Sequence, residues 1–236
     1  MGNVLYIVGS TSYVLRAFEP SSDYESIFLC DRKKSSKFSA RSIDYDLKDP
    51  NSNTNLIGHA SLHSHNISIL FSSYVADGLK NSDSIVDVQQ AFLYNCIKPV
   101  NLFSSLSLAF PKRKLTGVFI SSIYAHISPK YSNYKDKISQ NPLYYGICKA
   151  GVEQGLKWLS TQNQLHRFNS VVLGPMPNST AAKSDPGLID CLIKSLPSEQ
   201  MVNPMELSRV LNFLLDTEMV SLRGFSIPLD GGYMLW

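Results

Sequence analysis

Short apolar runs rich in β-branched residues recur along this chain of 236 residues, and longer amphipathic stretches lie between them. Apolar runs bounded by turn residues predict buried strands, and apolar residues spaced three and four apart predict helices. We therefore expect strands over 4–9, 26–31, 67–72, 117–122, 168–174 and 224–230, and helices over 86–110, 144–160 and 205–216. The alternation of the two patterns predicts βαβ units in an α/β fold with an open, doubly wound parallel sheet.

Composition supports a single folded domain. With 44% hydrophobic and 17% charged residues, the chain carries enough apolar material for a sizeable core. No repeat, low-complexity tract or linker divides it, so we expect one domain over 1–236. The formal charge of +3 and two short basic groups, 32–34 and 112–114, are too small to indicate a nucleic-acid partner.

Targeting signals and metal motifs are missing from the sequence. No apolar run approaches the ~20 residues of a membrane span, and the first strand is too short for a secretory signal. Tyr6 stands where an N-myristoylation motif needs Ser or Thr, so we expect a cytoplasmic protein with no membrane partner. His63 and His65 have too few neighbouring ligands for a metal, so we expect surface histidines and no metal site. No CxxC pair is present, and we expect reduced thiols at Cys30, Cys96, Cys148 and Cys191.

Tyr145 and Lys149 form the sharpest chemical signal, because a spacing of four near the start of a predicted helix places both side chains on one face. A cation one turn away stabilises a phenolate, so we expect Lys149 to lower the pKa of Tyr145 below its usual value of about 10. Such a phenol can act as a general acid or base near neutral pH. The pattern YxxxK is common by chance, and a surface tyrosine and lysine explain it at least as well, so its position carries the argument.

Two further polar residues precede this pair in the chain. Ser122 ends the strand expected at 117–122, at the edge of the sheet where doubly wound folds bind ligands. Asn95 lies within the otherwise apolar helix expected at 86–110. Taken singly, Ser122 could be a strand-end cap and Asn95 a helix-surface residue.

In the order Asn95, Ser122, Tyr145 and Lys149, these residues resemble the catalytic tetrad of the short-chain dehydrogenase/reductase family, classical type. The resemblance runs along nearly the whole chain, and includes a Gly174-Pro175 turn and the closing sequence Leu229-Asp230-Gly231-Gly232-Tyr233. It implies a Rossmann-type fold and an NAD(P)-dependent oxidoreductase. By that resemblance Tyr145 would be the general acid/base, and Ser122 would polarise the substrate oxygen. Lys149 would lower the phenol pKa and bind the nicotinamide ribose, and Asn95 would hold a water linking Lys149 to solvent.

The nucleotide-binding end departs from the family pattern. Members usually carry TGxxxGxG after the first strand, because glycines permit a tight turn and close approach of the backbone to the pyrophosphate. Here only Gly9 remains, Tyr13 and Leu15 add side chains, and SSYV at 72–75 replaces the usual NNAG. The resemblance still implies a set of cofactor-binding residues: Gly9, Ser10, Thr11, Ser12, Tyr13, Val14, Asp31, Asp46, Leu47, Ser73, Tyr145, Lys149, Gly174 and Pro175.

Asp31 bears on the choice of cofactor. It ends the second strand 22 residues after Gly9, close to the offset of about 20 at which an acidic residue binds the ribose 2′-hydroxyl. This favours NAD. NADP stays open, because Arg32, Lys33 and Lys34 could accept a 2′-phosphate, and a solvated strand end would explain Asp31 without any cofactor.

The segment 123–144 lengthens the interval from Ser122 to Tyr145 to 23 positions, roughly twice the usual spacing in the family. It is either a surface elaboration or, as we expect from its place before the catalytic helix, an inserted substrate loop. Its Pro- and Tyr-rich sequence resembles reductases of bacterial surface-sugar pathways, including those that make nonulosonic acids. A sugar-like substrate would suit the aromatic residues Tyr124, Tyr131, Tyr134 and Tyr144, and His126 could also touch it.

Two functions remain open at this point. The first is an oxidoreductase acting on a ketone or secondary alcohol of a sugar-like small molecule. The alternative is a non-catalytic relative that serves as a binding or assembly subunit, given the degenerate glycine loop. The resemblance also implies a homodimer or homotetramer built from the helices around Asn95 and Tyr145.

Overall fold

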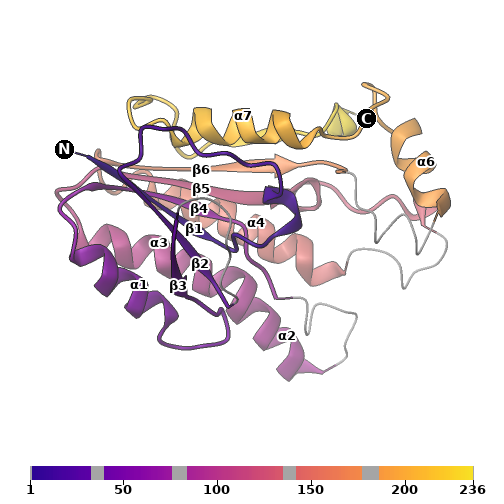
Figure 1. The fold of residues 1–236 in the computed structure, drawn as a ribbon. Coiled ribbons are helices and arrows are strands. Elements are labelled where there is room, and N and C mark those ends of the chain that lie inside the picture. The colour runs from indigo at the N-terminus through magenta and orange to yellow at the C-terminus, as the bar shows by residue number, and fades with distance from the viewer. Residues whose placement is uncertain (1, 33–39, 76–83, 135–141, 177–185, 236) are drawn as a thin grey trace.

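The computed structural model describes residues 2–32, 40–75, 84–134, 142–176 and 186–235 (Figure 1). These residues contain a seven-stranded sheet of order β3-β2-β1-β4-β5-β6-β7, in which all neighbours are parallel. The strands are β1 (Asn3–Val8), β2 (Ser26–Asp31), β3 (Arg41–Asp44), β4 (Asn66–Phe71), β5 (Leu115–Ser122), β6 (His166–Leu173) and β7 (Ser226–Leu229). The order reverses between β1 and β4, which confirms the predicted doubly wound, Rossmann-type fold.

Helices cover both faces of the sheet, which makes three layers (Figure 1). One face packs against α1 (Ser52–Ser61), α3 (Lys98–Ala109) and α4 (Leu143–Leu159) through a large apolar cluster. The opposite face packs against α7 (Pro204–Leu215), and α6 (Pro186–Lys194) lies beyond the sheet. Because both faces are covered, the central strands β5 and β6 are buried at every residue, polar side chains included.

The long helix expected over 86–110 is interrupted. It consists of α2 (Ile85–Phe92), a π-helical turn η2 (Leu93–Ile97) and α3. Turns of this kind are rare and occur frequently at functional sites. Asn95 stands at the centre of the π-helical turn. The sequence pattern also gave no sign of α1 or α6.

The connection between β1 and β2 holds a short 3-10 turn, η1 (Tyr13–Leu15), in place of the helix that a βαβ unit predicts. Pro20, Ser21 and Ser22 explain the difference, since proline and serine favour turns over helix interiors. Leu15 and Phe18 from this connection fill the core beside α7. A short turn that places Leu15 and Phe18 in the core therefore stands where a βαβ unit predicts a helix.

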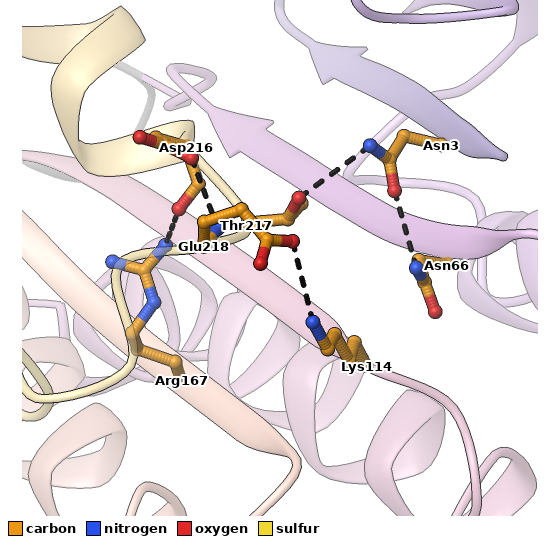
Figure 2. A network of polar contacts seen from close by, with 7 residues as sticks. All are labelled: Asn3, Asn66, Lys114, Arg167, Asp216, Thr217 and Glu218. Carbon is orange, nitrogen blue, oxygen red and sulfur yellow. Dashed lines mark hydrogen bonds and ion pairs between the residues drawn. The ribbon is translucent and has the colours of Figure 1, made fainter. Parts of the chain in front are cut away.

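The amino ends of the strands are closed by a polar network (Figure 2). Lys114, just before β5, contacts Glu218 at 3.3 Å, and Arg167 of β6 donates a hydrogen bond to the carbonyl oxygen of Asp216 at 2.5 Å. Around them the segment after α7 is tied to β1 and β4 by the side chains of Asn3, Asn66 and Thr217. The chemistry described next lies at the opposite, carboxyl end of the sheet.

Candidate active site

Ser122, Tyr145 and Lys149 come together at the carboxyl end of β5. Ser122 is the last residue of that strand, and its hydroxyl hydrogen-bonds to the phenol of Tyr145 in the first turn of α4. Lys149 follows one helical turn later, with Nζ 5.7 Å from the centre of the Tyr145 ring. The structure therefore assembles three of the four tetrad residues as the sequence predicted.

Lys149 is a buried cation, with 7% of its surface exposed. Its Nζ donates a hydrogen bond to the carbonyl oxygen of Ile120 at 2.7 Å and lies 4.4 Å from the centre of the Phe119 ring. Desolvation lowers its pKa to about 8, against the opposing influence of Cys148 and Glu153. At neutral pH the side chain is still mostly an ammonium ion.

The expectation that Lys149 would lower the pKa of Tyr145 is wrong for the free protein. Desolvation raises that pKa to about 12, the hydrogen bond from Ser122 lowers it in part, and Tyr74 raises it further. The physical reason is that Lys149 directs its Nζ to the carbonyl oxygen of Ile120, while the phenol is shielded from water. Tyr145 therefore holds its proton at neutral pH.

Tyr74 is a neighbour of Tyr145 that the sequence analysis did not single out. The two rings meet edge to face, with centroids 6.2 Å apart. Tyr74 belongs to the segment 72–75 after β4, where its position in place of the alanine of the family sequence NNAG was the available signal. An aromatic side chain thus stands beside the reactive phenol.

The side chain of Asn95 binds the backbone of the segment 72–75, and among the described residues its hydrogen-bond partners do not include the phenol of Tyr145. Its Oδ1 accepts a hydrogen bond from the backbone N–H of Val75 at 2.7 Å, and its Nδ2 donates to the carbonyl oxygens of Val75 and Ala91 at 2.9 and 3.0 Å. These bonds occupy the side-chain amide. Asn95 therefore fixes the backbone next to Tyr74.

The loop after β1 retains one feature suited to a pyrophosphate. Gly9 has φ of +79°, and a Cβ there would lie 2.7 Å from the backbone nitrogen of Ser73, so only glycine fits. Ser72 donates a hydrogen bond to Ser12 at 3.1 Å, which joins this loop to the one after β4. The hydroxyl of Ser10 is buried and has no hydrogen-bond partner among the described residues. A buried hydroxyl without a partner fits a phosphate oxygen as acceptor.

Asp31 lies at the carboxyl end of β2, as predicted, but its carboxylate is already engaged. Oδ2 accepts hydrogen bonds from the backbone and hydroxyl of Thr11 at 2.9 and 2.6 Å, and Oδ1 accepts one from the backbone of Arg32 at 2.8 Å. A ribose hydroxyl would have to share or displace Thr11. Lys33 and Lys34 lie outside the described residues.

Leu15 does not occupy the nucleotide loop as its place in the sequence suggested. It is 1% exposed and belongs to the core, so a cofactor would meet no side chain there. Tyr13 is 38% exposed and carries the Arg16 guanidinium 4.0 Å from its ring centre. Val14 is partly buried against the core. Of Tyr13, Val14 and Leu15, therefore, Tyr13 is the residue at the surface of this loop.

The other predicted cofactor residues lie at strand ends around the same edge. Asp46 accepts a hydrogen bond from the backbone of Lys48, whereas Leu47 is buried in the core. Gly174 approaches the chain after β7 so closely that a Cβ would lie 2.5 Å from the Cα of Asp230. The carbonyl oxygen of the next residue, Pro175, accepts a hydrogen bond from the backbone of Val202 at 2.9 Å.

Glu153 is a second residue that the sequence analysis missed. It lies on α4 one turn beyond Lys149, is 3% exposed, and accepts hydrogen bonds from Ser121 and from His126. The His126 contact, from Nε2 to Oε2, is 3.0 Å. The sequence signal that could have identified it is its spacing of four residues after Lys149, which places both side chains on one face of α4.

The segment 123–144 is described in part, because 135–141 lies outside the described residues. Its first half borders a cavity of about 380 Å³ whose walls are residues 124–129 and the first two turns of α4. The hydroxyls of Tyr124 and Tyr134 are 2.5 Å apart, and Tyr144 meets Phe92 edge to face. Nothing is described of the Tyr131 side chain.

The described residues contain no cluster of three or more His, Cys, Asp or Glu placed to hold a metal ion. The ring of His63 packs at a tilt against that of Phe28, and His65 contacts Glu25 at 2.6 Å. All four cysteines are free, as expected. In the same part of the chain no helix is long and apolar enough to cross a membrane.

Comparisons with known proteins agree with this geometry. A family model described as enoyl-(acyl carrier protein) reductase matches residues 31–234, from the last residue of β2 onward. The fold and this match define a short-chain dehydrogenase/reductase. The chain belongs to that family of NAD(P)-dependent oxidoreductases.

Individual relatives are more distant. The chain is 27% identical over 118 residues to the post-translational flagellin modification protein A of Campylobacter coli, a match that spans 49% of this chain and 44% of that protein. The chain thus covers less than half the length of this curated relative. A short-chain dehydrogenase from Leptospira borgpetersenii with bound NAD+ is 16% identical, with a TM-score of 0.78 over 99% of this chain and 93% of that one. The aldohexose dehydrogenase of Thermoplasma acidophilum is 17% identical, with a TM-score of 0.79 over 100% and 95%.

Proposed function

We propose that this protein reduces a ketone, or oxidises the matching secondary alcohol, on a sugar-like small molecule, with NAD as the preferred cofactor. The observation that carries the proposal is the meeting of Ser122, Tyr145 and Lys149 at the carboxyl end of β5. These residues supply a hydroxyl, a phenol and a cation at one edge of a doubly wound sheet, which is where such folds bind ligands.

Tyr145 is protonated at neutral pH, so in the reductive direction it can donate its proton to a carbonyl oxygen as that oxygen gains negative charge. Ser122, already hydrogen-bonded to the phenol, orients the same oxygen. Lys149, one helical turn away, would stabilise the phenolate left behind once its ammonium turns from the carbonyl oxygen of Ile120 towards the phenol. A bound nicotinamide cofactor supplies the hydride in this chemistry.

The cofactor would lie along the carboxyl ends of β1, β2 and β4. Gly9 allows close approach of its phosphates, and the unpartnered hydroxyl of Ser10 is a donor for one of them. Asp31 would accept the ribose 2′-hydroxyl and repel a 2′-phosphate, which is why we propose NAD over NADP. Replacement Asp31→Asn keeps the size of the side chain and removes its charge. In calorimetry it should reduce the difference between the Kd for NADH and the Kd for NADPH. Tighter binding of NADPH than of NADH by the unchanged protein would contradict the proposed role of Asp31.

A sugar-like substrate is supported by two kinds of observation. The segment 123–134 places Tyr124 and Tyr134 together beside α4, and aromatic residues of this kind suit the C–H faces and hydroxyls of a sugar. Among the similar proteins, one modifies flagellin after translation and one is an aldohexose dehydrogenase by name. These likenesses supply a substrate class, polyhydroxylated ketones and aldoses, for a first activity screen.

The test combines binding with turnover. NADH should bind weakly, with a Kd of roughly tens to hundreds of micromolar, because the loop after β1 has lost two glycines and its helix. A panel of keto-sugars should then oxidise NADH in a manner that Tyr145→Phe abolishes. If neither NADH nor NADPH binds a well-folded sample at millimolar concentration, the oxidoreductase proposal fails and a non-catalytic relative is left.

We also propose a homodimer or homotetramer in the cytoplasm. Large apolar side chains are exposed on neighbouring helices, Ile97 and Leu108 around α3 and Ile147 and Trp158 on α4. A second copy would bury them, and four free cysteines are compatible with a reducing compartment. Light scattering during size exclusion should give a multiple of the 26.3 kDa chain mass, and Trp158→Arg should reduce it.

A further inference from the structure

Glu153 is an ionisable residue that lies deep in α4, with no place in the mechanism given so far. One carboxylate oxygen accepts a hydrogen bond from the hydroxyl of Ser121, and the other faces Nε2 of His126 at 3.0 Å. Two donors on the two oxygens are the environment of an ionised carboxylate. Burial of such a charge is costly without a function or a compensating cation.

The nearest cation on the same helix face is Lys149, one turn earlier. The ammonium points to the carbonyl oxygen of Ile120, and within the described part of the chain no ion pair joins it to Glu153. The carboxylate nevertheless opposes the lowering of the Lys149 pKa by burial. Both are tied to consecutive residues of β5: Lys149 to Ile120 and Glu153 to Ser121. The residue after these two is Ser122, so the pair also fixes the strand end that carries the substrate-binding hydroxyl.

Cys148 is the other group that could favour the charged form of Lys149. Desolvation raises the pKa of its thiol to about 12, so the thiol carries no charge at the pH where Lys149 titrates. A neutral thiol gives no Coulombic support to an ammonium ion. Glu153 is therefore the anion that offsets the burial of Lys149.

We propose that Glu153 is a positioning residue that keeps Lys149 in its ammonium form and, through Ser121, holds the end of β5 in register with α4. The proposal rests on the function proposed above, because the charge on Lys149 matters for a phenolate at Tyr145. His126 orients the carboxylate from the segment after β5. The titratable groups next to this pair are Tyr145 and Cys148 on α4 and His126 after η3 (Ile123–Ala125). Tyr74 and Cys96 lie one contact further away, against Tyr145 and Cys148 respectively.

The charge on Lys149 can be measured without any catalysis. In protein labelled with ¹³Cε-lysine, the Lys149 resonance is identified by its loss in Lys149→Met, and its chemical shift is followed from pH 6 to pH 11. In Glu153→Gln, which keeps the shape but removes the charge, the midpoint should move towards acid by about one pH unit. A midpoint that coincides with that of the unchanged protein would overturn the proposal.

A second variant covers the case in which a buried glutamine disturbs folding. Glu153→Met keeps the length of the side chain and removes its charge without adding a buried amide. It leaves Ser121 and His126 without their acceptor, and it should move the midpoint in the same direction. Glu218→Gln is the matched control, because it removes one carboxylate from an exposed position far from the site, and its midpoint should not move.

Turnover separates this proposal from the function on which it rests. If keto-sugar reduction is found, the alkaline limb of the kcat/KM profile should move with the Lys149 midpoint in both Glu153 variants. If the midpoint moves but no carbonyl is reduced by any protein, the electrostatic role of Glu153 stands and the proposed function fails. If reduction is found and neither the midpoint nor the pH profile moves, Glu153 has a structural role alone.

Discussion

Replacing Lys149 by methionine should stabilise the protein at neutral pH while abolishing its activity. The pKa of Lys149 falls from 10.5 to about 8 on folding, so the folded state disfavours the ammonium by about 3 kcal/mol. Methionine fills much of the same volume and has no charge to desolvate. It leaves the carbonyl oxygen of Ile120 without its partner, at a cost of about 1 to 2 kcal/mol. The net gain at pH 7 is about 1 to 2 kcal/mol.

The pH dependence of this gain has a definite sign. Below pH 8 the lysine is protonated in both the folded and the unfolded state, and the folded protein bears the full cost. Between pH 8 and 10.5 the unfolded state binds more protons than the folded state, so the stability of the unchanged protein rises with pH. Above pH 10.5 the cost has vanished, and the lost hydrogen bond leaves Lys149→Met the less stable protein.

Urea unfolding followed by far-ultraviolet circular dichroism at pH 7, 8, 9 and 10 measures the effect as a difference between the two proteins. Contributions from other titrating groups cancel in that difference. Lys114→Met is a suitable control, because Lys114 is partly exposed and its charge remains in contact with water. A difference in unfolding free energy that stays constant within about 0.5 kcal/mol over this range would refute the assignment of Lys149 as a costly buried cation.

Three further outcomes follow from the site. Tyr145→Phe should abolish turnover with less than a few-fold change in the Kd for NADH, and more than about a tenth of the original activity would contradict its role as the acid. Leu15→Ala should cost about 2 to 5 kcal/mol in urea unfolding because Leu15 fills the core, whereas Tyr13→Ala on the loop surface should cost less than about 1 kcal/mol; equal costs would show that the loop is misplaced. Gly146→Ala should lower both thermal stability and kcat, because a Cβ there would lie 2.3 Å from the carbonyl oxygen of Tyr124; an unchanged melting temperature would show that this contact can relax freely.

Much of the active site could be predicted because it depends on local order in the chain. A strand that ends in Ser122 and a helix that begins with Tyr145 and Lys149 bring their side chains to one edge of any doubly wound sheet. What could not be predicted was the environment of those groups. The raised pKa of Tyr145 depends on how completely neighbouring segments exclude water from its hydroxyl, and one of them carries Tyr74 from 71 residues earlier in the chain.

The nucleotide loop shows the limit of a residue pattern. The sequence showed that glycines were missing at Tyr13 and Leu15, but it did not show that the helix after β1 had been lost as well. Without that helix Leu15 turns into the core, and its side chain no longer lies where a glycine-rich loop would meet a cofactor. Similarly, Asn95 stands where the chain order of the catalytic tetrad predicts an asparagine, but its amide is hydrogen-bonded to the backbone of Val75. Only the packing of η2 against the segment after β4 could reveal these bonds.

The sequence by itself determined the doubly wound parallel sheet, its covering layers of helices and the convergence of Ser122, Tyr145 and Lys149. Apolar periodicity and helical spacing depend only on residues that are near one another in the chain. The tertiary structure decided which polar groups are charged and which are committed to other partners. Glu153 beside His126, Asp31 bound to Thr11, and a buried ammonium at Lys149 all depend on contacts between distant segments. Electrostatic energies are set by distance and by exclusion of water, and both are known only when the chain has packed.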